Sequence, residues 1–191
     1  MKPALLIIDM QNDGIKPESR LYTPGALDII PVINRLSAAA RSHNLPVIWI
    51  CQEHRHQLTD FGREADISPI HCVEDTRGSA LIDGLVQQPE DYTVIKRRYS
   101  GFNNTDLETI LRCLQVDTVV VTGIITDGCV LMTAMDAHAR DFYLRVVTDA
   151  TATTDNESHQ AALRIMARTQ PGVLVSSEEA IELITKHEII H

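Results

Sequence analysis

Short apolar runs alternate with segments of helical periodicity along the chain. Apolar runs that predict buried strands lie at 4–9, 47–51, 92–96, 119–122, 143–147 and 172–175. Apolar residues that return every three or four positions predict helices at 29–40, 105–114, 131–140, 157–168 and 177–186, with a further short helix at 79–86. Strand and helix therefore alternate about six times.

This alternation predicts an α/β fold, because right-handed crossovers between parallel strands place helices on both faces of a sheet. We expect a three-layer open sheet of the Rossmann type with about six mostly parallel strands. A chain of 191 residues suits one domain over 1–191 and is long enough to bury roughly 70 % of its unfolded surface.

The stretch 119–140 predicts a buried strand, a tight turn at Gly123 and then a helix. Cys129 lies at the mouth of that helix, where unpaired backbone N–H groups and the helix dipole favour an anion. We therefore expect its thiol to lean towards thiolate, the form that attacks carbonyl groups. Position alone leaves open that Cys129 is an ordinary buried cysteine, a common role for this residue.

Three reactive side chains follow predicted strands at the point where each strand ends: Asp9, Lys96 and Cys129. In an open parallel sheet this edge forms the ligand crevice. Lys96 can stabilise a thiolate, and Asp9 can accept a proton and return it to a leaving amine. The alternative at this level is a buried ion pair between Asp9 and Lys96 beside an idle thiol.

The longest stretch without a clear period is 52–77, which is rich in His, Asp and Glu. Long irregular segments inside compact domains are usually functional or cover a site. We expect this segment to form part of a substrate pocket or an oligomer contact.

Charge and composition argue against several classes of partner. The formal charge is −9, and Lys and Arg cluster only at 96–98, which argues against a nucleic-acid partner. We find no glycine-rich nucleotide motif, signal peptide or transmembrane run, so we expect a cytoplasmic protein with no membrane partner. The four cysteines have no metal-binding spacing and fit a reducing compartment.

Four motifs together resemble those of the isochorismatase-like cysteine hydrolases. They are Ile-Ile-Asp-Met-Gln-Asn-Asp at 7–13, Lys-Arg-Arg-Tyr-Ser-Gly-Phe at 96–102, Thr-Asp-Leu at 105–107 and Thr-Gly-Ile-Ile-Thr-Asp-Gly-Cys-Val at 122–130. The resemblance extends from Ala4 to about Ile184. This superfamily includes nicotinamidases, N-carbamoylsarcosine amidases, and ureidoacrylate and biuret hydrolases, and its fold is the open sheet expected above.

The resemblance implies a catalytic triad of Asp9, Lys96 and Cys129. Cys129 would attack the amide or ureide carbonyl, Asp9 would carry the proton to departing ammonia, and Lys96 would hold the charges in place. It also implies a cis peptide between Ile124 and Ile125, which turns the N–H groups of Ile125 and Cys129 towards the oxyanion. No cofactor is expected.

Two departures from the family pattern concern the substrate. Family members often carry an aromatic residue where this chain has Gly14. Nicotinamidases carry an Asp-x-His pair and a later His that bind a metal, whereas Gln52 stands here at the Asp position, before His54, with His71 as the later histidine. Loss of the acid weakens a metal site, and we expect none.

Without a metal, His54 and His71 are expected to reach the polar end of the substrate. Arg98, Tyr99 and Phe102 follow Lys96 closely and are also candidates to line the pocket, with an Arg suited to a substrate carboxylate. The alternative for these three is a solvated basic turn in which the aromatic rings serve ordinary packing.

The sequence thus predicts a cysteine amidohydrolase that releases ammonia from a small carboxamide or from a carbamoyl or ureido compound through a Cys129 thioester. Alternatives are a nicotinamidase with a degenerate metal site, and a non-catalytic ligand-binding or thiol-sensing member of the fold. The family resemblance implies a homodimer or homotetramer. The expected partner is the small-molecule amide or ureido substrate.

Overall fold

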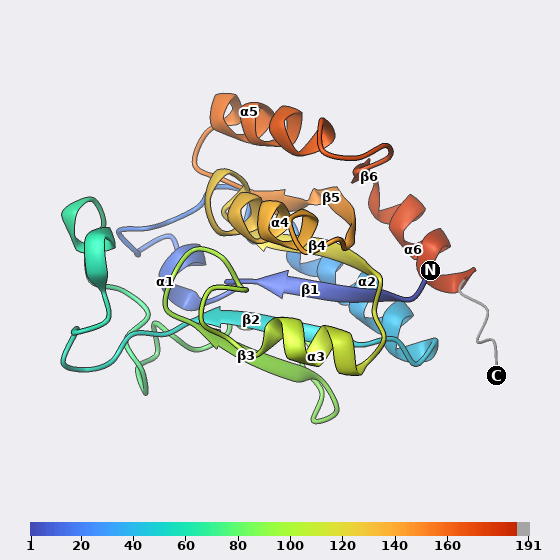
Figure 1. Ribbon diagram of the computed structural model, residues 1–191. Helices are drawn as coiled ribbons and strands as arrows, with labels where there is room; N and C mark the ends of the chain where they lie inside the picture. The colour runs from blue at the N-terminus through green and yellow to red at the C-terminus, as the bar shows by residue number, and fades with distance from the viewer. Residues whose placement is uncertain (187–191) are drawn as a thin grey trace.

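The computed structural model places a six-stranded parallel sheet at the centre of the molecule (Figure 1). Its strands are β1 (Pro3–Ile8), β2 (Val47–Gln52), β3 (Tyr92–Lys96), β4 (Thr118–Ile124), β5 (Tyr143–Ala152) and β6 (Leu174–Val175). They lie in the order β3-β2-β1-β4-β5-β6, and every neighbouring pair is parallel. The structure describes residues 1–186, so the end of the domain expected over 1–191 lies outside the described part.

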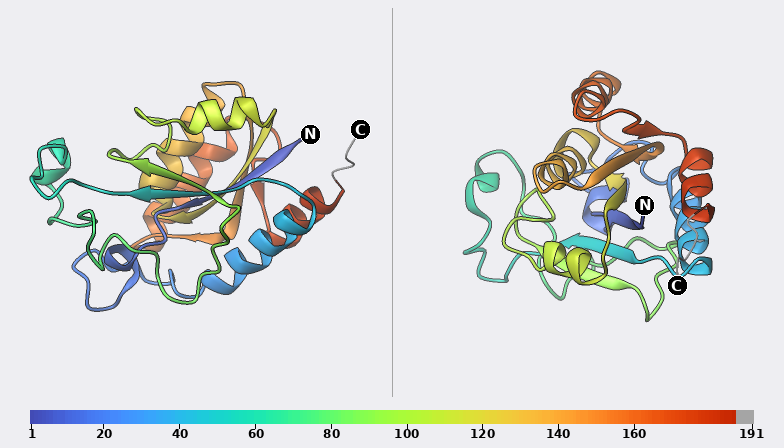
Figure 2. Two further views of the ribbon diagram at one scale, coloured as in Figure 1. Left: turned by 90° about the horizontal axis from the view of Figure 1, so that it is seen from below. Right: turned by 45° about the vertical axis from the view of Figure 1, so that its right-hand side comes forward.

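Helices cover both faces of the sheet and complete the expected three layers (Figures 1 and 2). They are α1 (Asn12–Ile15), α2 (Ile30–Ser42), α3 (Leu107–Cys113), α4 (Leu131–His138), α5 (Asn156–Ala167) and α6 (Ser177–Thr185). A 3-10 turn, η1 (Gly62–Asp66), and a π-helical turn, η2 (Thr126–Val130), add to these. Helices α2 and α6 lie on one face, and α3, α4 and α5 on the other.

The continuous apolar sequence of β1 reflects burial on both sides. Leu6 and Ile8 join the core beneath α3 and α4, whereas Leu5 and Ile7 join the core beneath α2. All four side chains are at most 1 % exposed. Burial of each contributes about 1.5 to 3 kcal/mol, which explains why an alternating polar pattern is absent from this strand.

The order in which the strands are added changes direction between β1 and β4: β2 and β3 lie on one side of β1, and β4, β5 and β6 lie on the other. Gly123 allows the two strands to approach closely at this point. A Cβ atom at this position would lie 2.1 Å from the carbonyl oxygen of Ile8, and the backbone φ of +107° also favours glycine. The glycine therefore places the turn that carries Cys129 directly beside Asp9.

The helix expected at 79–86 is absent, and this prediction is wrong. The segment forms turns and pairs with the residues after β1: Ile82 N–H donates to the Met10 carbonyl and Asn12 N–H to the Ala80 carbonyl. Gly84 adopts a φ of +96°, which ends any helical course. Hydrogen bonds to a distant segment thus replace those that a local helix would make.

The irregular segment 52–77 projects from the side of the sheet where β1 and β2 end, at the left of Figure 1. It contains η1 and one isolated bridge between His54 and Val73. At the other end of the chain, α6 begins with a capping box formed by Ser176 and Glu179.

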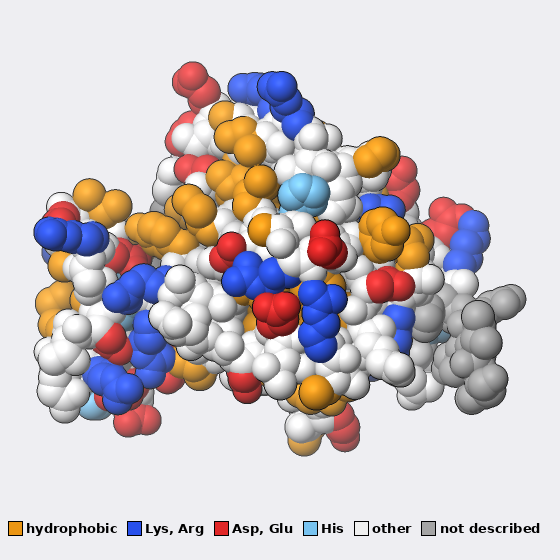
Figure 3. Space-filling view, in the orientation of Figure 1, with side chains coloured by type: hydrophobic (Ala, Val, Ile, Leu, Met, Phe, Trp, Pro, Cys, Tyr) orange, Lys and Arg blue, Asp and Glu red, His pale blue; other side chains and the backbone are white. Residues whose placement is uncertain are grey.

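The described surface mixes charges of both signs. Figure 3 shows Lys and Arg side chains interspersed with Asp and Glu on the face of α3 and α4, where Arg140 contacts Glu108 at 3.0 Å and Asp136 at 3.1 Å. This view offers no broad basic patch of the kind that nucleic acids require. Among the described residues, no helix combines the length and the apolar character that crossing a bilayer demands.

Candidate active site

Four functional side chains come from the ends of four neighbouring strands. Lys96 ends β3, Gln52 ends β2, Asp9 follows β1, and Cys129 lies in the η2 turn after β4. Lys96 and Gln52 are also register partners in the sheet. The sheet order therefore lines up an ammonium, a carboxamide, a carboxylate and a thiol along one edge.

Lys96 is the centre of this arrangement. Its ammonium is fully buried and lies 2.8 Å from Asp9 Oδ2, 3.1 Å from Gln52 Oε1 and 3.3 Å from Cys129 Sγ. A lysine has three N–H donors, so each donor has one partner. The second carboxylate oxygen of Asp9 accepts the backbone N–H of Gln52 at 3.0 Å. Asp9 itself has a φ of +50°, a conformation that Asp tolerates better than most residues.

The surroundings of Cys129 work against the thiolate expected from its position at the helix mouth. Burial is the largest cause and raises the pKa of the thiol well above its ordinary value, and the Asp9 carboxylate raises it further. Lys96 lowers the pKa but does not offset these two effects. Loss of water around the sulfur therefore opposes the thiolate form.

The turn that carries Cys129 begins immediately after the peptide bond between Ile124 and Ile125, which is cis. The turn contains Gly128, whose backbone is non-helical at φ −119° and ψ −106°, and it leads directly into α4. Ile125 and Cys129, the two residues expected to supply oxyanion donors, both line the same cavity.

That cavity has a volume of about 230 Å³ and opens at the carboxyl ends of the strands. Among its lining residues are Asp9, Gly14, Arg20, Gln52, Glu64, His71, Tyr99, Ile125 and Cys129. Pockets for drug-sized ligands span roughly 300 to 1,000 Å³, so this one suits a small molecule. The segment 52–77 supplies part of its wall, as expected.

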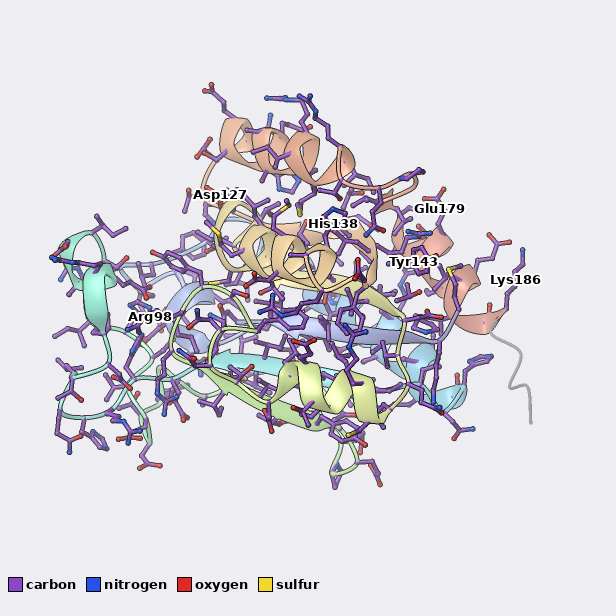
Figure 4. All side chains as sticks on the ribbon, in the orientation of Figure 1. Arg98, Asp127, His138, Tyr143, Glu179 and Lys186 are labelled. Atoms are coloured by element: carbon purple, nitrogen blue, oxygen red, sulfur yellow. The ribbon has the colours of Figure 1, made fainter. Side chains whose placement is uncertain are left out.

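The structure places only some of the residues expected to contact a substrate at the cavity. Tyr99 and His71 line the cavity, while His54 is fully buried behind His71, with their rings 5.6 Å apart. Arg98 and Phe102 do not line the cavity, and for them the expectation is wrong. Arg98 is exposed beside the segment 52–77, where its guanidinium donates to the carbonyl of Asp60 at 2.6 Å (Figure 4).

Phe102 turns into the core instead. Its ring lies 6.1 Å from that of Phe142, and the guanidinium of Arg140 stacks over it at 4.9 Å. In the segment after β3, Tyr99 therefore faces the cavity, Arg98 lies at the surface and Phe102 packs in the core. The arginine that lines the cavity is Arg20, from the loop after α1. It is exposed, and none of the described carboxylates pairs with it.

A second polar cluster, His54, Glu64 and His71, adjoins Gln52. Their potential ligand atoms all lie within 4.8 Å of one another. His71 Nδ1 lies 2.8 Å from the Pro69 carbonyl and Nε2 3.3 Å from Glu64 Oε1. The Pro69 carbonyl and the Glu64 carboxylate are both acceptors, which favours a proton on each nitrogen of His71.

The pKa shifts of the cluster agree with this assignment. Burial alone would lower the pKa of His71, but the hydrogen bond to Glu64 raises it above its ordinary value. Likewise, burial would raise the pKa of Glu64, but His71 lowers it overall. Burial lowers the pKa of His54, which stays neutral.

The motif residues 11–13 hold neighbouring segments in place, and Gln11 also lines the cavity. Gln11 donates to the carbonyls of Gln52 at 2.8 Å and Ser79 at 2.6 Å. Asp13 Oδ2 accepts the backbone N–H of Cys72 at 2.8 Å. These contacts fasten the segments 72–81 and 52–54 to the end of β1, which fixes the position of the cluster relative to Lys96.

The comparison with known families matches this arrangement. The sequence model of the isochorismatase domain family matches residues 3–180 of the chain. The chain belongs to the isochorismatase domain family. Among similar family members is an Arabidopsis thaliana protein named probable inactive nicotinamidase, 35 % identical over 83 % of this chain and 84 % of that protein.

Two further family members extend the comparison. The ureidoacrylate amidohydrolase RutB of Methylobacterium radiotolerans is 33 % identical over 83 % of this chain and 70 % of that protein. The crystal structure of an isochorismatase-like hydrolase from Alkaliphilus metalliredigens has a TM-score of 0.88 at 33 % identity, covering 96 % of this chain and 99 % of that chain. The family and the expected fold are therefore confirmed.

A metal ion is implied by another family structure, the pyrazinamidase of Pyrococcus horikoshii in complex with zinc, with a TM-score of 0.84 at 28 % identity over 92 % of this chain and 99 % of that chain. The residues of this chain do not fit such an ion. Gln52 Nε2 lies 2.8 Å from His54 Nε2 and 2.9 Å from Glu64 Oε2, in the space that an ion between them would need. An amide –NH₂ group donates hydrogen bonds and does not ligate cations.

Three side chains that the sequence did not mark as substrate contacts line the cavity: Glu64, Arg20 and the carboxamide of Gln52. Glu64 lies among many acidic residues in an irregular segment, and no spacing sets it apart. Arg20 lies in a loop whose course depends on tertiary contacts. Gln52 was noticed only as the loss of an acid, although its place at a strand end next to Lys96 was a usable signal.

Proposed function

We propose that this protein is a cysteine amidohydrolase that releases ammonia from a small carbamoyl or ureido compound or a carboxamide through a Cys129 thioester. One observation carries the proposal: the Lys96 ammonium lies 2.8 Å from the Asp9 carboxylate and 3.3 Å from the Cys129 thiol beside a cavity. A carboxylate base, a cation and a nucleophile in mutual contact suit acyl transfer. The similarity to an amidohydrolase supports this reading.

The first step in this mechanism is attack by sulfur on the substrate carbonyl carbon. Burial favours the neutral form of the Cys129 thiol, so its proton leaves as the S–C bond forms, and the Asp9 carboxylate beside it accepts that proton. Lys96 stabilises the negative charge that develops on sulfur. The carbonyl oxygen takes the electron pair of its π bond, and the N–H groups of Ile125 and Cys129 stabilise it.

Collapse of the tetrahedral intermediate breaks the C–N bond. Asp9 returns its proton to the departing nitrogen, which leaves as ammonia, and a thioester or thiocarbamate remains on Cys129. Water then attacks this carbonyl while Asp9 removes a proton. The C–S bond breaks, the thiol is restored with that proton, and the acid or carbamate product departs.

Three features of the cavity favour a small, polar and anionic substrate. Its volume of about 230 Å³ limits size. Tyr99 and His71 offer polar contacts, and Arg20 supplies a positive charge suited to a carboxylate. These features fit a carbamoyl or ureido acid better than an uncharged aromatic amide. The lack of an aromatic side chain at Gly14 points the same way.

The experiment that tests the proposal measures ammonia release from a panel of nicotinamide, biuret, ureidoacrylate-like compounds and N-carbamoyl amino acids. Wild type and Cys129→Ala are compared, each with and without a chelator. We expect release from a ureido or carbamoyl compound that requires Cys129 and ignores the chelator.

Other results would select the alternatives. Release from nicotinamide that a chelator abolishes would favour a metal-dependent nicotinamidase. Tight binding of panel compounds without turnover would favour a non-catalytic protein, a possibility that the name of the Arabidopsis relative raises. Assembly into a homodimer or homotetramer also stays a proposal, which light scattering measures directly.

A further inference from the structure

The carboxamide of Gln52 bridges two charged clusters. Its oxygen accepts a hydrogen bond from the Lys96 ammonium at 3.1 Å. Its nitrogen lies 2.8 Å from His54 Nε2, 2.9 Å from Glu64 Oε2 and 3.3 Å from His71 Nε2. The side chain is only 4 % exposed, so water offers few other partners.

The orientation of this carboxamide follows from its neighbours. An ammonium has only donors, so the atom 3.1 Å from Lys96 must be the oxygen. The –NH₂ group then faces the opposite cluster, where its two hydrogens reach the lone pair of neutral His54 and the carboxylate of Glu64. Rotation by 180° would set the –NH₂ group against the Lys96 ammonium and the amide oxygen against the Glu64 carboxylate.

We propose that the Gln52 –NH₂ group takes the place of a metal ion among His54, Glu64 and His71, so that these residues form a metal-free site. Zinc binds nitrogen and oxygen ligands at about 2.0 to 2.1 Å. An ion at that distance from His54 and Glu64 would overlap the Gln52 nitrogen, which lies within 3.3 Å of all three side chains.

The two hydrogens of the amide give His54 and Glu64 the electropositive partner that an ion would otherwise supply. Lys96 holds the amide in this orientation and adds a positive charge nearby, which further disfavours a cation. For catalysis, and here the inference rests on the proposed function, Glu64 and His71 meet the substrate as hydrogen-bonding groups.

The test is zinc binding by wild type, Gln52→Glu and the control Gln57→Glu, measured by titration calorimetry. Gln52→Glu is nearly isosteric and replaces the –NH₂ donor by an anionic oxygen that faces His54 and Glu64. Gln57→Glu makes the same change at an exposed position of the same segment. Circular dichroism confirms that each variant is folded.

We expect Gln52→Glu to bind one zinc ion at least about 100-fold more tightly than wild type, since even indirect partners of metal ligands contribute 10- to 100-fold. Adding His71→Ala to Gln52→Glu should remove this gain, and Gln57→Glu should behave as wild type. Equal affinity in wild type and Gln52→Glu would overturn the proposal.

A second measurement does not depend on any variant. Wild-type crystals grown with excess zinc should show no anomalous density between His54 and His71, and a peak there would refute the proposal. Because zinc binding and ammonia release are separate readouts, silence of the substrate panel would reject the proposed activity while leaving this inference standing.

Discussion

The ammonium of Lys96 lies 3.3 Å from the sulfur of Cys129, although the two residues are 33 positions apart in the chain. Lys96 ends β3 and Cys129 follows β4, and the strands β2 and β1 lie between them. The carboxyl ends of β2 and β1 contribute Gln52 and Asp9. A fully buried lysine is costly unless each of its donors is paired. Here the three partners come from three different strand ends, so the sheet order itself assembles the site.

Replacing Cys129 by alanine should lower ammonia release at least about 10³-fold, because loss of a covalent nucleophile removes the acyl-enzyme route. The matched control is Cys113→Ala, since this cysteine is exposed and lies in α3 away from the cavity. A Cys129→Ala variant with wild-type turnover would refute the thioester mechanism.

Replacing Lys96 by methionine should slow alkylation of Cys129 at neutral pH. Lys96 lowers the pKa of this thiol, so its removal raises the pKa further, and each unit costs about tenfold in thiolate. The measurement is the pH dependence of iodoacetamide modification at Cys129, followed by mass spectrometry in a Cys113→Ala background.

Two other cysteines do not confuse this reading. Mass spectrometry assigns each modification to its own cysteine, so Cys51 and Cys72, whose pKa values burial also raises, are followed separately from Cys129. Lys186→Met, at an exposed position, serves as the control for loss of a lysine. An alkylation profile of Lys96→Met that matches wild type would contradict the electrostatic role of Lys96.

Replacing Arg20 by glutamine should raise the KM for substrates that carry a carboxylate about tenfold or more, because a charge-assisted hydrogen bond is lost. The kcat should change little, since Arg20 does not contact the triad. Amides without a carboxylate should be unaffected, and so should Arg63→Gln, whose side chain is 97 % exposed. Equal KM changes for charged and neutral substrates would argue against carboxylate recognition.

The periodic parts of the chain were predictable because positions that become buried carry apolar residues. The runs that became β1, β2 and β4 are buried on both faces, and α2, α5 and α6 carry clear helical stripes. The segment 79–86 has a similar stripe but hydrogen-bonds to residues 10–12 instead. Its conformation is set by a distant partner, which local sequence does not reveal.

The same contrast applies to the site. Asp9, Lys96 and Cys129 could be grouped because each follows a strand and all strands of a parallel sheet end at one edge. The rise in the pKa of Cys129 could not be foreseen, because it depends on how completely the surrounding residues exclude water. Nor could the positions of Arg20 and Glu64, whose loops are placed by contacts with the segments around them.

The pair of Arg41 and Asp91 provides a test of the fold that is independent of catalysis. Asp91 accepts hydrogen bonds from Arg41 Nη2 at 2.6 Å and from the indole of Trp49 at 2.8 Å. Burial would raise the pKa of Asp91, but these donors lower it overall. Asp91→Asn should therefore reduce the free energy of unfolding by about 2 kcal/mol at pH 7.

The sign of the pH dependence follows from the depressed pKa of Asp91. A group of this kind contributes its full stability above its unfolded pKa of about 3.9 and loses it as the pH falls through the lower folded value. The difference between wild type and Asp91→Asn should therefore shrink below about pH 4. Urea unfolding followed by the fluorescence of Trp49, the single tryptophan, measures it. The control Asp66→Asn disrupts an exposed pair with Arg63 and should show no such pH-dependent loss of stability. A stability difference between wild type and Asp91→Asn that persists unchanged in acid would contradict the role of the Asp91 carboxylate.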